Sequence, residues 1–142
     1  DASLSCDLAG RMSGGGVIKE SRHKKYIHVF TLSCDAANAH NQLLISWRNG
    51  WKFNLFHLSD LDSVMCSDKP LIDEGHPEAG FDTIEGSGSG YLNGKPATIR
   101  FRLSDAGEPG RNDRVEYSIT GEGGAHVSGT LDGGNHQAHR DF

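Results

Sequence analysis

The sequence has 142 residues, the length of a single domain, and no apolar run in it approaches the roughly 20 residues that a membrane-spanning helix needs. Glycine is the compositional outlier with 19 residues, yet the four prolines and the lack of a G-X-Y repeat exclude a collagen-like chain. A net charge of −5 provides no broad positive surface, so we expect no nucleic-acid binding. Because no long apolar run is present, we expect no membrane insertion.

The first residues, Asp1-Ala2-Ser3, contain neither a methionine nor an apolar leader. A mature exported protein begins in this way once its signal peptide has been removed, although a trimmed chain would look the same. We therefore expect a protein that is secreted or held at the cell surface. We divide the chain into an N-terminal arm (residues 1–13), a β domain (14–135) and a C-terminal tail (136–142).

Strand signals are frequent along the chain, whereas helical periodicity is hard to find. In the first expected strand, Tyr26, Phe30 and Leu32 share one face while Ile27 and Val29 share the other, which predicts a central strand covered on both sides. Turn-rich segments separate the strands at the spacing typical of a sandwich or barrel. The sequence therefore predicts an all-β fold, a single antiparallel β-sandwich or flattened barrel with little helix. The expected strands are Lys25–Cys34, Gln42–Arg48, Lys52–Leu58, Asp82–Leu92, Pro96–Asp105, Arg114–Thr120 and His126–Leu131. The expected core is Phe30, Leu32, Phe53, Leu55, Ile99, Phe101, Leu103, Val115, Tyr117 and Ile119.

The three cysteines, Cys6, Cys34 and Cys66, allow one disulfide and leave one thiol over. Cys34 ends one apolar strand and Cys66 follows another, whereas Cys6 lies in the N-terminal arm. We therefore predict a Cys34–Cys66 disulfide. Three reduced, buried thiols are the alternative, because disulfide formation follows the compartment and not the sequence.

The first of two Asn-Gly pairs, Asn49-Gly50, predicts a tight hairpin, since a two-residue type I′ loop needs positive φ at both central residues. This loop would place Arg48 opposite Trp51. Both faces of the hairpin carry large apolar residues, so the sequence leaves open which face is buried.

The second pair, Asn93-Gly94, predicts a hairpin that sets Gly88 opposite Ile99. The alternating glycines of Gly-Ser-Gly-Ser-Gly then form one face of a strand and leave room for large side chains on its neighbour. No phosphate-binding loop is predicted here, because no helix N-terminus follows the glycines.

Four acidic residues form a candidate calcium site. If the register of the second hairpin persists, Asp82 lies opposite Asp105, and two facing carboxylates repel unless a cation or an arginine lies between them. Glu108 and Asp113 lie on the adjoining loop, and flexible loops rich in carboxylates suit Ca²⁺. The simpler interpretation is a tight turn in which Asp105 and Asp113 accept hydrogen bonds from backbone N–H groups.

His136 and His139 are a weaker candidate pair for a transition metal. No third ligand identifies itself by its spacing, and the simpler interpretation is a solvated tail or a cap on the last strand. Nucleophilic catalysis has little support, because there is no G-x-S-x-G elbow and acidic residues follow Cys66, where they disfavour a thiolate.

Several motifs along the chain carry a family resemblance: the segment from Gly10 to Gly16 with its glycine triplet, Gly-Phe-Asp-Thr at Gly80–Thr83, the Asp-x-Gly-Glu-Pro-Gly-x-x-Asp run within Ser104–Asp113, and Gly133–His139. Their order resembles that of small Gly-rich bacterial exported β domains, which occur alone or near modules of the post-choice-of-anchor kind. The resemblance covers nearly the whole chain. It implies secretion and an all-β fold, and because no established activity accompanies the family, it transfers no active-site residue.

We therefore expect a non-catalytic extracellular module with a structural, adhesive or assembly role at a bacterial surface. Its partners would be further copies of itself or other surface proteins, since exposed sheet edges permit strand addition. The alternative is a metal-dependent enzyme or small-ligand-binding protein that uses the acidic loop and the terminal histidines. Calcium is the cofactor that the sequence favours, ahead of a transition metal on the two histidines.

Overall fold

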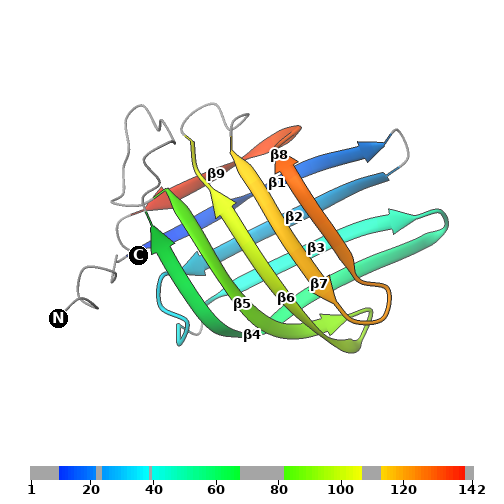
Figure 1. The fold of residues 1–142 in the computed structure, drawn as a ribbon, viewed down its shortest axis with the longest axis horizontal. Helices are drawn as coiled ribbons and strands as arrows, with labels where there is room; N and C mark the ends of the chain where they lie inside the picture. Colours follow the sequence, from blue (N-terminus) through cyan, green and yellow to red (C-terminus); the bar gives the residue numbers. More distant parts are fainter. Residues whose placement is uncertain (1–9, 22–23, 39, 68–81, 107–112, 140–142) are drawn as a thin grey trace.

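The computed structural model describes residues 10–21, 24–38, 40–67, 82–106 and 113–139, with residue 139 described by its backbone alone. This part of the chain contains no helix and forms nine strands (Figure 1). They are β1 (Arg11–Ser21), β2 (Lys24–Ser33), β3 (Gln42–Asn49), β4 (Lys52–Ser67), β5 (Thr83–Leu92), β6 (Lys95–Ser104), β7 (Arg114–Thr120), β8 (Ala125–Thr130) and β9 (Gly133–His139).

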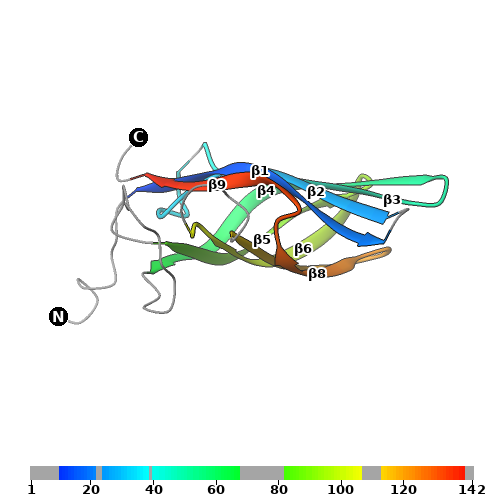
Figure 2. The ribbon, with the colours of Figure 1, turned by 90° about the horizontal axis from the view of Figure 1, so that it is seen from above.

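All nine strands belong to one antiparallel sheet with the order β8-β7-β6-β5-β4-β3-β2-β1-β9. The sheet curls until its two halves face each other, with β9, β1, β2 and β3 in one layer and β5 to β8 in the other (Figure 2). The 16-residue strand β4 passes from the first layer into the second. This arrangement confirms the predicted all-β fold, an antiparallel sheet curled into a flattened barrel.

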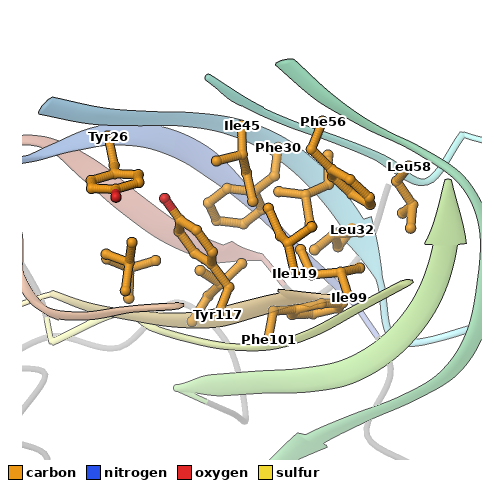
Figure 3. Close-up of a cluster of buried hydrophobic side chains, with 14 of the residues drawn as sticks. Tyr26, Phe30, Leu32, Ile45, Phe56, Leu58, Ile99, Phe101, Tyr117 and Ile119 are labelled. Atoms are coloured by element: carbon orange, nitrogen blue, oxygen red, sulfur yellow. The ribbon is translucent and has the colours of Figure 1, made fainter. Parts of the chain in front are cut away.

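The hydrophobic core lies between the two layers (Figure 3). The predicted core residues are buried there except Phe53 and Leu55, which are 54% and 40% exposed. That part of the prediction was wrong because alternate residues of a strand point to opposite faces, and the buried face of this hairpin carries Trp47, Phe56 and Leu58 instead. The structure thus decides the question that the sequence left open.

The Asn93-Gly94 hairpin has the predicted register, with Gly88 paired to Ile99 and positive φ at both loop residues (54° and 82°). The other hairpin differs from its prediction. Its loop is Gly50-Trp51, so that Asn49 pairs with Lys52. Gly50 alone has a positive φ, of 64°, which fits a type II′ turn with glycine at the first central position.

Glycine in β5 allows β4 to bend around it. A Cβ atom at Gly90 would collide with the carbonyl oxygen of His57, and one at Gly88 with that of Asp60. In the same region the pairing of β4 with β5 shifts register twice, between Leu58 and Asp60 and again between Leu61 and Ser63. Such irregularities increase strand twist, and the close backbone approach explains why these positions are glycine.

Two strands lie where the sequence indicated none. β1 begins at Arg11, inside the predicted N-terminal arm, and β9 extends to His139, inside the predicted C-terminal tail. Their glycine-rich sequences lack the apolar alternation that marks a strand. The expectation that β2 is covered on both faces was also wrong among the described residues, since Ile27 and Val29 are 44% and 56% exposed on its outer face.

Candidate functional site

The predicted disulfide is present. Cys34, which follows β2, is bonded to Cys66 near the end of β4, with 5.7 Å between their Cα atoms. The bond joins segments 32 residues apart in the sequence and closes the core at that end of the sheet. Cys6 lies outside the described residues.

Two of the four predicted acidic residues, Asp105 and Asp113, lie at the edge of β9, where their carboxylates accept hydrogen bonds from backbone N–H groups. Asp113 is fully buried, and its carboxylate accepts hydrogen bonds from the N–H groups of Ala106 (2.6 Å) and His136 (2.7 Å). The carboxylate of Asp105 accepts one from the N–H group of Ala138 (2.8 Å). Because β9 has β1 on its other side, these two carboxylates occupy the edge where a further strand would pair.

Asp82 faces Asp105 across the strand ends, as the hairpin register predicts: the Asp105 N–H group donates to the Asp82 carbonyl oxygen at 2.8 Å. The fully buried carboxylate of Asp82 accepts a hydrogen bond from the Thr83 hydroxyl (2.7 Å). Asp105 and Asp113 thus accept hydrogen bonds from backbone N–H groups, as the simpler interpretation anticipated. Asp113 bonds Ala106 as well as β9, whereas Asp105 bonds β9.

A buried pair of histidines lies beside these carboxylates. Nδ1 of His136 is 2.8 Å from the Ser104 carbonyl oxygen, which only accepts, so this nitrogen carries the proton. Nε2 of His136 then accepts a hydrogen bond from the Nε2–H group of His28, 2.7 Å away. Nδ1 of His28 is left with a lone pair and has no hydrogen-bond partner among the described residues.

Burial keeps both imidazoles neutral. It lowers the pKa of His28 to about 3, with a further contribution from the neighbouring His136. Burial also lowers the pKa of His136 to about 4, although the Ser104 carbonyl group and the charge of Asp105 act in the opposite direction. A proton added to His28 would have to go to a buried nitrogen without a partner, which explains the direction of the shift.

The predicted metal ligands are only partly assembled. His136 and position 139 are three apart in β9, so they belong to opposite faces of the sheet. Glu108 and the side chain of His139 lie outside the described residues. Within the described part of the chain, no group of three or more His, Cys, Asp or Glu side chains is arranged to hold a metal ion. Calcium binding stays a prediction.

Two further surfaces stand out on the outer faces of the layers. On the first layer, exposed apolar residues form an outer apolar face, made of Ile27, Val29, Leu44, Phe53 and Leu55. On the second layer, a hollow of about 510 Å³ crosses β4 to β8. Along it runs a polar row, made of Ser63, Ser87, Arg100, Ser118 and His126.

Sequence reasoning missed His28 as a member of the histidine pair, since its partner lies 108 residues away. The available signal was its place on the same face of the strand as Tyr26 and Phe30, where a polar side chain needs a partner. It also missed the polar row. The register of the Asn93-Gly94 hairpin gives only one pair of that row, Ser87 with Arg100.

No known protein family matches the sequence, and searches of characterised proteins and of solved structures find no significant match either. In the described residues there is no helix long and apolar enough to cross a membrane.

Proposed function

We propose that this domain is a non-catalytic extracellular module that serves a structural or assembly role at a bacterial surface and associates with a second copy through its outer apolar face. The observation that carries the proposal is the exposure of large apolar side chains on neighbouring strands of one layer. Contiguous apolar patches on a protein surface often mark interaction sites, whereas single exposed apolar side chains do not.

The side chains of the outer apolar face are neighbours in the sheet. Val29 pairs with Leu44 across β2 and β3, and Ile27 and Leu55 both pair with Ser46 on β3. Two such faces pack as the layers of a β-sandwich do, with interdigitating side chains. A face that binds its own copy needs no second complementary surface, because a two-fold axis brings the same residues together.

The charges around the outer apolar face favour an antiparallel arrangement of two copies. Lys25 and Arg48 are exposed where β2 begins and β3 ends, while Asp35 and Asp60 are exposed toward the opposite ends of β2 and β3. A two-fold axis near Val29 would therefore set the basic end of one copy over the acidic end of the other. Such complementarity orients partners more than it adds affinity.

Assembly by strand addition has less support at the β9 edge, because the carboxylates of Asp105 and Asp113 already bind its N–H groups. The alternative function, a metal-dependent enzyme or ligand-binding protein built on the acidic loop and terminal histidines, is weakened by the same contacts and by the burial of His136. The disulfide supports export, since such bonds persist in oxidising compartments.

Sedimentation velocity over a range of protein concentrations tests the proposal. We expect the wild-type domain to form dimers as its concentration rises, and the double variant Val29→Lys/Leu44→Lys to stay monomeric. Ser128→Lys/Thr130→Lys places two lysines at exposed positions of β8 on the other layer and should dimerise like wild type. A wild-type protein that is monomeric at every concentration, or a Val29/Leu44 variant that dimerises normally, would contradict the proposal.

A further inference from the structure

The polar row on the second layer is built from one residue of each of five adjacent strands. Ser63 pairs with Ser87, Ser87 with Arg100, Arg100 with Ser118, and Ser118 with His126. The hollow of about 510 Å³ follows this row across the strands, and its size is within the usual range of small-ligand sites. A second hollow of about 270 Å³ shares Ser87, Arg100 and Ser118 with it.

Arg100 lies at the centre of the polar row. Arg102 is the next residue of β6 on the same face, and its partners on the neighbouring strands are Glu85 and Glu116. Its guanidinium binds the Glu85 carboxylate at 3.1 Å. The exposed guanidinium of Arg100, by contrast, has a serine on each neighbouring strand and makes no ion pair or hydrogen bond with the described residues. A planar guanidinium with free donors fits a carboxylate in bidentate fashion.

The groups around Arg100 indicate what else the ligand carries. Ser87 and Ser118 flank the guanidinium, and their hydroxyl groups both donate and accept hydrogen bonds. The carboxylate of Glu116 also lines the hollow; it accepts hydrogen bonds from hydroxyl groups and repels a second negative charge. The arrangement therefore favours a ligand with one carboxylate and several hydroxyl groups over a compact dianion such as phosphate.

We propose that the polar row binds a sugar acid, such as a uronic acid residue of an acidic polysaccharide, with its carboxylate on Arg100 and its hydroxyl groups on the flanking serines and Glu116. The two hollows on either side of Arg100 provide room for sugar units that neighbour the bound one, and Glu85, Glu116 and Asp62 in their lining favour uncharged units there. This site lies on the layer opposite the outer apolar face and does not depend on self-association.

Calorimetric titration with a trisaccharide that carries one galacturonate between two galactose units, and with a hyaluronan disaccharide, which also carries a single carboxylate, tests the proposal. Galactotriose is the uncharged probe and inorganic phosphate the simple anion. We expect at least one of the two uronates to bind, with an affinity that falls as ionic strength rises. Galactotriose and phosphate should bind at least about tenfold more weakly, since the loss of one charged hydrogen-bonding partner has that effect.

Arg100→Gln should lower the uronate affinity at least about tenfold. Its melting temperature should stay near that of wild type, because the side chain is exposed and forms no ion pair with the part of the chain that the structure describes. Arg114→Gln is the matched control, since Arg114 is an exposed arginine of β7 outside both hollows. Absence of binding by both uronates, equal binding of phosphate or galactotriose, or equal affinity in the two variants would each overturn the proposal.

Discussion

The buried histidine pair makes the stability of the domain depend on pH. His28 and His136 are neutral in the folded state, where burial lowers their pKa values to about 3 and about 4, whereas an unfolded histidine has a pKa near 6.5. Below pH 6.5 the unfolded chain therefore binds protons that the folded protein does not. The stabilising contribution of the pair is complete above pH 6.5 and is lost as the pH falls toward 4.

The expected magnitude follows from these pKa values. Between the unfolded and folded pKa values, each histidine costs about 1.4 kcal/mol of unfolding free energy per pH unit. From pH 7 to pH 5 the loss is about 1.9 kcal/mol for each, so about 4 kcal/mol for the pair. Such a loss is a large fraction of the roughly 5–15 kcal/mol that stabilises an ordinary domain.

Urea denaturation at pH 7 and pH 5 measures this loss directly. We expect His28→Gln, whose amide can still donate a hydrogen bond to His136, to show about half of the wild-type difference. His57→Gln changes an exposed histidine on the outer side of β4 and should keep the full difference. The reasoning would be refuted if the wild-type protein lost less than about 1 kcal/mol between these pH values, or if His28→Gln behaved like wild type.

Three further substitutions test the fold and its closure by denaturation. Phe56→Ala should lower the free energy of unfolding by about 3–5 kcal/mol because Phe56 is fully buried, whereas Phe53→Ala, at an exposed position, should lower it by less than about 1 kcal/mol. Similar losses in the two variants would contradict the face assigned to this hairpin. Gly90→Ala should lower the free energy of unfolding by more than about 2 kcal/mol, because the added Cβ atom meets a backbone oxygen of β4. Gly133→Ala has open space around the added atom and should lower it by less than about 1 kcal/mol. Equal effects would refute the close approach of β4 to β5. Asp113→Ala leaves two backbone N–H groups without their acceptor and should cost about 2–4 kcal/mol; a loss below about 1 would show that β9 is held by other contacts.

Local sequence was sufficient where one short segment sets the geometry. Asn93-Gly94 sets the register of β5 and β6 because both residues readily adopt the positive φ that a type I′ turn requires. The other hairpin shows the limit of this rule. Asn49-Gly50 and Gly50-Trp51 are both acceptable two-residue loops, and the second is the one adopted, with Ile45 paired to Phe56 in the core.

The candidate site was predictable only in part. The sequence placed Asp82 opposite Asp105 and suggested that Asp105 and Asp113 bind backbone N–H groups, since both follow from one hairpin and one turn. It did not show that these carboxylates reach β9, nor that His136 meets His28. Those contacts join segments that lie up to 108 residues apart and exist only once the sheet has curled.

By itself, the sequence determined the all-β class, most of the strands, the second hairpin and the pairing of Cys34 with Cys66. The tertiary structure decided which face of each strand is covered, because alternation with a period of two separates two faces without saying which one meets the other layer. It also decided that β1 and β9 pair, since their glycines carry no apolar pattern, and that the carboxylates of Asp105 and Asp113 close the free edge of β9. Both outcomes depend on the curl of the whole sheet, which no single segment of the chain encodes.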